Sequence, residues 1–398
     1  MNHFNLFELP EVLNRALQNM QFSKPTPIQA QTIPHALKGR DILGSAQTGT
    51  GKTAAFGIPL VARLLSNQHG SALVMTPTRE LAAQVMTQLQ AMLGKQGPIK
   101  TALLIGGEPM PKQLKQLRSR PRLLVGTPGR INDHLQQGNL ILHDTDVLVL
   151  DETDRMLDMG FTSQIEKILK FMPNTRQTML FSATLPNNII KIAENYLNNP
   201  VRVAVDKTIS PVKKIRHDVL RVSEEEKYRK LLSELDARTG SVIVFVKTKY
   251  GTEKMAKQLS KAGHNANAIH GDLRQNKRDR VIANFRSQKY RILVATDVAA
   301  RGLDIPHIEH VINYDLPHCA EDYIHRIGRT ARAGADGSAI CLVTPANARK
   351  WNAINRLMNP GAADKKPSEQ RYKKRSGKPS DFKNNGKKFN RCINRKAA

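Results

Sequence analysis

Short runs of aliphatic and β-branched residues alternate with amphipathic stretches along most of this 398-residue chain. Between the runs, apolar residues recur at helical spacing, as at Leu81, Val85, Leu89 and Leu93. Such alternation predicts an α/β fold in which helices cover both faces of doubly wound parallel sheets. The predicted strands form two series, first at residues 41–43, 73–75, 123–125, 147–150 and 179–181, then at 242–246, 292–294, 310–312 and 340–343.

A polar stretch that contains a proline and a lysine pair separates the two series of strands, as a linker does. We therefore predict two domains, residues 1–206 and 215–359, joined by a linker at residues 207–214. The remaining segment, residues 360–398, holds 13 Lys or Arg and three Asp or Glu, a net charge of +10, with few apolar residues. Because such a composition cannot bury a core, we expect a disordered basic tail.

The whole chain carries 62 Lys and Arg against 34 Asp and Glu, a net charge of +28. This excess predicts a polyanionic partner, either a nucleic acid or an anionic membrane surface. No apolar stretch approaches the roughly 18 residues of a membrane span, and no secretory signal is visible. The three cysteines are far apart and form no CxxC pair, which argues against a zinc ribbon and favours a reducing, cytoplasmic location.

A glycine-rich turn, AQTGTGKT at residues 46–53, nearly matches the phosphate-binding pattern GxxxxGK[ST], with Ala46 in place of the first glycine. The two inner glycines allow backbone N–H groups to turn toward phosphates, and Lys52 can reach the β and γ phosphates. The Thr53 hydroxyl is suited to Mg²⁺, and the following helix adds its N-terminal dipole. We assign nucleotide binding to Gly49, Thr50, Gly51, Lys52 and Thr53.

Two adjacent carboxylates, Asp151 and Glu152, follow the apolar strand at residues 147–150. The carboxyl ends of parallel strands are where α/β sheets place their sites. About 100 residues after a phosphate-binding loop, such a pair indicates nucleotide hydrolysis. We expect Asp151 to hold Mg²⁺ and Glu152 to orient and deprotonate the attacking water.

Further motifs follow one another in a fixed order. They are PTRELA at residues 77–82, TPGR at 127–130, DETD at 151–154, SAT at 182–184, ATD at 295–297, RGLD at 301–304 and HRIGRTAR at 325–332. From about residue 4 to residue 345 the chain resembles the DEAD-box family of ATP-dependent RNA helicases, in particular bacterial members with a short basic tail. The resemblance implies two tandem RecA-like domains that use ATP and Mg²⁺ and act on RNA.

The resemblance also implies roles for residues outside the phosphate loop. Gln29, in the segment FSKPTPIQ, would pair with the adenine edge, and Phe4 would pack on the base. Arg329 and Arg332 would act as arginine fingers on the γ-phosphate, and Asp304 would contact the ribose side. Coupling of hydrolysis to domain closure would involve Asp154, Ser182, Thr184 and His325. Contacts to the RNA backbone would come from Arg79, Gly106, Gly107, Thr127, Arg130, Thr248, Lys249, Gly271 and Arg301.

Three residues depart from the family pattern. Thr153 stands where the family has Ala, and we expect a small effect there. Gln21 stands where Gly is usual, which costs roughly 1 kcal/mol if that position has a positive φ. Ala331 also replaces a common Gly, and we expect its methyl group to leave the arginine fingers undisturbed.

The sequence thus predicts an RNA-dependent ATPase that locally unwinds short RNA duplexes or remodels ribonucleoprotein. Two alternatives remain at this point: a DNA-directed helicase of the same superfamily, and a passive RNA-annealing or scaffolding protein that no longer turns over ATP. The RNA itself is left open, with ribosomal and mRNA-decay ribonucleoprotein both compatible with the chain.

Overall fold

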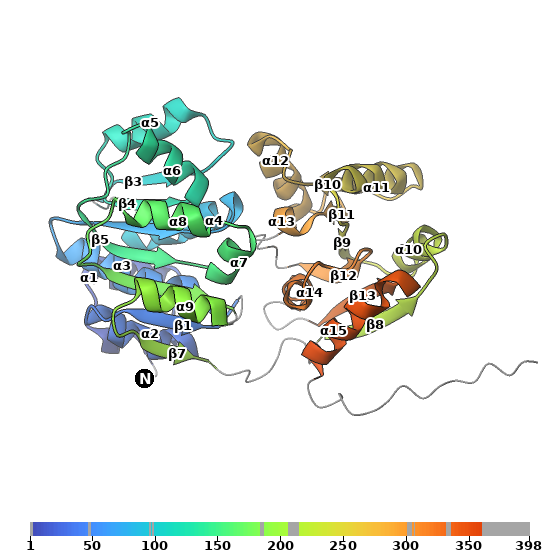
Figure 1. Cartoon of the computed structure of the whole chain (residues 1–398), viewed down its shortest axis with the longest axis horizontal. Coiled ribbons are helices and arrows are strands. Elements are labelled where there is room, and N and C mark those ends of the chain that lie inside the picture. The colour runs from blue at the N-terminus through green and yellow to red at the C-terminus, as the bar shows by residue number, and fades with distance from the viewer. Residues whose placement is uncertain are drawn as a thin grey trace, which may run out of the picture. The chain divides into compact units, whose positions relative to one another are not determined.

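The computed structural model describes residues 3–46, 49–94, 97, 99–183, 187–205, 215–300, 305, 307–331 and 336–359 (Figure 1). The predicted linker and the predicted basic tail lie outside these residues. So do four predicted site residues, which are Thr184, Arg301, Asp304 and Arg332. Within the described ranges, no helix is both long and apolar enough to cross a lipid bilayer.

The first sheet is parallel, with seven strands in the order β3-β4-β2-β5-β6-β1-β7. Its strands are β1 (Ile42–Ser45), β2 (Ser71–Met75), β3 (Thr101–Leu104), β4 (Leu123–Gly126), β5 (Thr145–Leu150), β6 (Gln177–Ser182) and β7 (Val201–Ala204). Its helices are α1 (Glu11–Asn19), α2 (Pro27–Leu37), α3 (Lys52–Ser66), α4 (Arg79–Leu93), α5 (Met110–Arg118), α6 (Pro128–Gln136), α7 (Thr153–Asp158), α8 (Thr162–Leu169) and α9 (Asn187–Tyr196), after a short 3₁₀ turn at Phe4–Phe7.

The second sheet is also parallel, with six strands in the order β10-β11-β9-β12-β13-β8. Its strands are β8 (Ile215–Arg221), β9 (Ser241–Phe245), β10 (Ala266–Ile269), β11 (Ile292–Ala295), β12 (Ile308–Asn313) and β13 (Gly337–Val343). Its helices are α10 (Lys227–Asp236), α11 (Lys249–Lys261), α12 (Gln275–Arg286), α13 (Asp297–Ala300), α14 (Ala320–Ile327) and α15 (Ala348–Met358).

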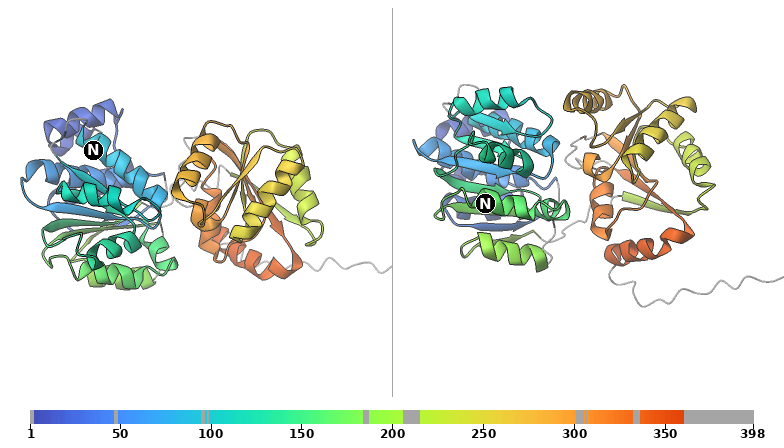
Figure 2. Two further views of the ribbon diagram at one scale, coloured as in Figure 1. Left: turned by 90° about the horizontal axis from the view of Figure 1, so that it is seen from above. Right: turned by 45° about the horizontal axis from the view of Figure 1, so that its top comes forward.

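Helices cover both faces of each sheet, as Figure 2 shows. Successive residues of a strand point to opposite faces of the sheet, and in these strands the residues on both faces are apolar. Both faces must therefore be covered by helices. In β5, Val147 and Val149 belong to the core cluster that includes α3 and α4, whereas Leu148 and Leu150 belong to the cluster that includes α6 and α8. The predicted doubly wound α/β architecture is therefore confirmed.

Every strand expected from the sequence is present, and the predicted helix over residues 81–93 lies within α4. The structure adds four strands that the sequence analysis did not predict, namely β3, β7, β8 and β10. All four lie at the edges of the two sheets.

Candidate nucleotide and RNA sites

Apart from Phe4 and Gln29, which precede β1, the described site residues predicted for the first sheet lie at or after the carboxyl ends of its strands, here called the carboxyl edge. Residues assigned to the nucleotide follow β1, β5 and β6, which are neighbours in the sheet. Residues assigned to RNA follow β2, β3 and β4, which form the adjoining half. The two predicted groups of residues therefore occupy adjoining halves of one edge, and the boundary between them falls between β2 and β5.

The phosphate-binding loop leads from β1 into α3, and its described glycines have the backbone conformation that the pattern predicts. Gly49 has φ +83° and Gly51 has φ +94°, and Gly51 is the N-cap residue of α3. A Cβ atom at Gly51 would lie 2.4 Å from Nε2 of Gln29 and would displace that amide, and the positive φ also favours glycine there. The buried Lys52 ammonium donates to the Ala46 carbonyl at 2.8 Å, which holds its charge inside the loop.

The predicted adenine-site residues have different surroundings: Gln29 lies next to this loop, and Phe4 lies in the hydrophobic core of the same domain. Nε2 of Gln29 donates to the carbonyl of Gly51 at 3.1 Å, and its Oε1 accepts from the backbone N–H of Thr26 at 2.9 Å. The Phe4 ring is buried edge-on against Phe7 and Phe22. In this structure both side chains therefore contact the protein, and their role toward a base stays a prediction.

The acidic motif begins directly after β5. Asp151 is buried, and burial raises its pKa to about 7, although Lys52 acts in the opposite direction. A cation placed against such a carboxyl favours its charged form. The Asp151 carboxyl therefore suits a divalent metal ion that is bound to the phosphates of a nucleotide. Glu152 has φ +51°, an uncommon backbone conformation for a side-chain-bearing residue, which occurs at functional turns more often than elsewhere.

Two further members of the acidic motif have defined partners. Asp154 accepts from the backbone N–H of Ala183 at 3.1 Å, so the DETD and SAT motifs are joined directly. The SAT motif also contacts the start of the glycine-rich turn, since the Ala46 N–H donates to the carbonyl of Ser182 at 3.1 Å. Thr153 is fully buried and its hydroxyl donates to the carbonyl of Leu150, which explains how Thr is accommodated where the family has Ala.

On the RNA half of this edge, Arg79 lies against the glycine pair of the loop between β3 and α5. A Cβ at Gly107 would lie 2.4 Å from Nη1 of Arg79, and one at Gly106 would lie 3.1 Å from Nη2. Gly107 has φ +80°. Arg130 donates to the carbonyl of Glu108 at the end of the same loop. The structure therefore brings together four of the five RNA residues predicted in the first domain, which are Arg79, Gly106, Gly107 and Arg130.

The second sheet repeats this arrangement with different residues. Thr248 follows β9 and accepts from the backbone N–H of Gly251 as the N-cap of α11. Lys249 begins that helix, and its Cε would lie 3.7 Å from a Cβ at Gly271, which follows β10, the second strand from β9 in the sheet. These three predicted RNA residues are thus neighbours, on one half of the carboxyl edge.

The predicted arginine-finger segment follows β12 through α14. Arg329 is buried, and its Nε donates to the carbonyl of His325 at 3.2 Å. His325 Nδ1 is buried without a hydrogen-bond partner among the described residues. The structure thus pairs these two predicted residues on one turn of chain.

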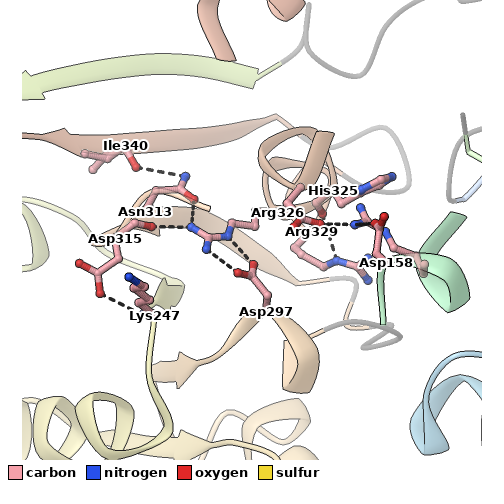
Figure 3. Close-up of polar contacts among 11 residues, drawn as sticks. Asp158, Lys247, Asp297, Asn313, Asp315, His325, Arg326, Arg329 and Ile340 are labelled. Atoms are coloured by element: carbon pink, nitrogen blue, oxygen red, sulfur yellow. Dashed lines mark hydrogen bonds and ion pairs between the residues drawn. The ribbon is translucent and has the colours of Figure 1, made fainter. Parts of the chain in front are cut away.

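Arg326 is a central residue of the second domain to which the sequence analysis gave no role. It forms a bidentate pair with Asp297, at 2.5 and 2.7 Å, and also donates to Oδ1 of Asn313 and to the carbonyl of Asp315 (Figure 3). Its guanidinium lies 4.7 Å from the centre of the Phe245 ring. This side chain fixes α14, which carries His325 and leads to Arg329, against the ends of β9, β11 and β12. The only signal in the sequence was its place inside the HRIGRTAR motif.

Two parallel sheets with a phosphate-binding loop, a buried acidic pair and arginines on the second sheet define a nucleotide hydrolase of the P-loop class. Comparisons with known proteins narrow this class. Residues 26–192 match the DEAD/DEAH box helicase family, and residues 226–334 match the helicase conserved C-terminal domain. The chain belongs to the DEAD-box helicase family, as its motifs predicted.

Relatives support this membership across both sheets. The DEAD-box ATP-dependent RNA helicase CshA of Geobacillus kaustophilus is 45% identical over 89% of this chain and 76% of its own length. The Bacillus subtilis protein of the same name is 43% identical over 88% of this chain and 71% of its own. Among solved structures, S. cerevisiae Dbp5 bound to RNA and ADP BeF3 matches with a TM-score of 0.80 at 31% identity, covering 92% of this chain and 95% of that chain.

Proposed function

We propose that this protein is an RNA-dependent ATPase that locally unwinds short RNA duplexes or remodels ribonucleoprotein. The observation that carries the proposal is the division of the carboxyl edge of the first sheet, where the residues predicted for the nucleotide and those predicted for RNA lie on adjoining halves. The second sheet carries its own group of predicted RNA residues, and its domain carries the predicted arginine fingers Arg329 and Arg332. Closure of the two domains would then couple ATP binding and RNA binding reciprocally.

In the nucleotide site, Lys52 would neutralise phosphate charge, and the hydroxyl of Thr53 and the carboxylate of Asp151 would hold Mg²⁺. The metal would neutralise charge on the phosphates of ATP. Glu152 orients the attacking water and accepts its proton, while Arg329 and Arg332 stabilise charge on the γ-phosphoryl oxygens. Gln29 and Phe4 select the adenine, and Asp304 contacts the ribose.

Asp154 would transmit the loss of the γ-phosphate to the rest of the domain. Its carboxylate already accepts a hydrogen bond from the backbone N–H of Ala183 in the SAT motif. Ser182, Thr184 and His325 complete this coupling group. On the RNA side, glycine N–H groups, hydroxyls and guanidinium groups recognise phosphates and 2′-hydroxyls rather than base edges. We therefore expect little sequence preference from the folded core.

Two other functions considered from the sequence are not favoured. A DNA-directed helicase does not fit the match to Dbp5, whose structure contains RNA. A passive annealing protein would not require the buried Lys52 and Asp151 of an intact nucleotide site. We propose a cytoplasmic location, with ribosomal or mRNA-decay ribonucleoprotein as the class of partner.

The test is steady-state ATP hydrolysis by the full-length protein, with single-stranded RNA, with DNA of matched sequence, and with neither. We expect stimulation by RNA and not by DNA. Glu152→Gln should lower the stimulated rate by at least about 100-fold, because general-base catalysis contributes that much or more. Equal stimulation by DNA, or turnover that is indifferent to RNA, would contradict the proposed function.

A further inference from the structure

Gln113, on the buried face of α5, bridges the two ends of the glycine loop in the first domain. Its Nε2 donates to the carbonyl of Ile105 at 3.0 Å and to that of Glu108 at 3.3 Å. These two carbonyls stand on either side of Gly106 and Gly107. The Gln113 side chain is only 1% exposed, so water does not compete for these bonds. One amide group therefore closes the turn against which Arg79 lies.

The other atom of the same amide reaches a different RNA element. Oε1 of Gln113 lies 3.2 Å from Nε2 of His134, on α6. That helix begins directly after Thr127, and its first turn carries Arg130. The Gln113–His134 contact thus spans from the glycine loop to the helix of the TPGR motif.

The chemistry of the partners fixes the direction of each hydrogen bond. Backbone carbonyls can only accept, so the Gln113 NH₂ group must face Ile105 and Glu108, and its oxygen must face His134. His134 Nε2 must then carry a proton and donate it. His134 Nδ1 is buried and has no hydrogen-bond partner among the described residues, and burial lowers the pKa of this imidazole. A neutral imidazole protonated on Nε2 satisfies all of these conditions.

We propose that Gln113 and His134 are positioning residues for RNA binding, which together hold the glycine loop and the TPGR helix at a fixed spacing. Neither side chain is placed to contact RNA, because both are almost fully buried. Both act through Arg79, the Gly106–Gly107 turn and Arg130. This inference rests on the proposed function, since it assigns the supports of the RNA site and not those of the nucleotide site.

Gln113→Met removes the amide while keeping the length of the side chain. We expect the RNA concentration for half-maximal ATPase stimulation to rise about five- to tenfold, because two carbonyls and one imidazole lose their partner. The stimulated rate at saturating RNA and the unstimulated rate should both stay within about twofold. A side chain that merely stabilised the fold would not separate these quantities.

Gln116 provides a matched control on the same helix. Its Oε1 accepts from the backbone N–H of Leu103 at 3.2 Å, so Gln116→Met also removes one side-chain-to-backbone bond, but away from the glycine loop. We expect no more than about a twofold change in half-saturating RNA for this variant. An equal rise in both variants would overturn the proposal in favour of general destabilisation.

A pair of substitutions at His134 tests the same idea should Gln113→Met fail to fold. His134→Gln keeps a donor where Nε2 lies and should remain near the unchanged protein, whereas His134→Phe should raise half-saturating RNA about fivefold. Equal behaviour of these two variants would overturn the proposal. Absence of RNA stimulation in the unchanged protein would overturn the proposed function and this inference together, whereas normal stimulation with an unaffected Gln113→Met would overturn the inference alone.

Discussion

The RNA-side loops of the two domains are supported by different chemistry. In the first domain the support is neutral, an amide and an imidazole, Gln113 and His134. In the second domain it is ionic, since Asp315 accepts from the Lys247 N–H at 2.9 Å and from the buried Lys227 ammonium at 2.7 Å. Neutral groups lose one bond when a partner is removed, but a buried ion loses the compensation for its charge. The second domain should therefore be less tolerant of single substitutions.

Arg326→Met should produce the largest effect. It leaves the Asp297 carboxylate without its bidentate partner and two further acceptors without a donor. We expect a loss of about 3–5 kcal/mol in the free energy of unfolding of the second domain. The single tryptophan, Trp351, packs edge-on against Tyr323 in this domain, so urea unfolding followed by its fluorescence measures the effect.

Arg326→Lys is the informative companion variant. A lysine keeps the charge but not the planar fork that reaches both oxygens of Asp297. It should therefore recover less than half of the lost stability. Full recovery would show that charge alone matters at this position, and would weaken the contrast between the two domains.

Lys227→Met should have the second-largest effect, about 2 kcal/mol, because Asp315 would keep the Lys247 N–H but lose its buried cation. The double variant Lys227→Met/Asp315→Asn should be more stable than the sum of the single effects predicts, since no unpaired charge remains. Urea unfolding of the unchanged protein, the two single variants and the double variant, followed by Trp351 fluorescence, gives the free energies for this double-mutant cycle. Strict additivity would contradict an ionic support.

The neutral support of the first domain should weaken on mild acidification, because a proton added to the buried Nδ1 of His134, which has no hydrogen-bond partner among the described residues, would leave a charge uncompensated there. Burial, with the nearby Arg130, lowers the pKa of His134 from its usual 6.5. The folded state thus binds its proton less well than the unfolded state, so this contribution to stability is complete above about pH 6.5 and is lost as the pH falls through the lowered pKa. RNA affinity should weaken over the same range, and His134→Gln should remove this part of the dependence.

His217 and His310 of the second domain also have lowered pKa values through burial, so the pH dependence of total stability is not specific to His134. The comparison that counts is the difference in half-saturating RNA between the unchanged protein and His134→Gln, measured from pH 7.5 to 5.5. A difference that does not vary with pH would contradict the assigned role of the neutral imidazole.

Sequence reasoning found every interior strand and missed every edge strand. Interior strands are buried on both faces, so β4 and β11 are continuous apolar runs. The edge strands β7 and β8 are half exposed and mix charged residues with apolar ones, as Arg202 and Asp218 show. Their strand conformation depends on pairing with β1 and β13, which are distant in the sequence. Local pattern carries no record of that pairing.

The candidate site shows the same division between local and distant information. Roles for Lys52 and Asp151 could be predicted from the sequence because each lies in a short motif whose chemistry depends on adjacent residues. Gln113 and Arg326 were not, because their roles depend on partners that other elements supply. Nothing in the local sequence distinguishes Gln113, which bridges two loop carbonyls, from any other glutamine on an amphipathic helix. Residues that support a site are therefore harder to predict than residues that touch the ligand.

The smallest predicted effects concern one strained residue in each domain, and they show whether the contrast extends to the backbone. Gln21 has φ +60°, which meets the condition under which its replacement of glycine was expected to cost stability. Ala331 has φ +56°, so it carries the same strain beside the arginine-finger helix. A left-handed backbone conformation destabilises a residue that carries a side chain by about 1–2 kcal/mol. A glycine removes this strain, but it also raises the conformational entropy of the unfolded chain, which offsets part of the stabilisation.

Gln21→Gly and Ala331→Gly should therefore each stabilise their domain by about 0.5–1 kcal/mol. Circular dichroism in urea reports the first and Trp351 fluorescence the second. Equal gains would show that backbone strain is spread evenly, leaving the difference between the domains in their side-chain supports. A gain at Gln21 alone, with a loss of RNA-stimulated ATPase in Ala331→Gly, would instead indicate that the strained turn at Ala331 helps to orient Arg329.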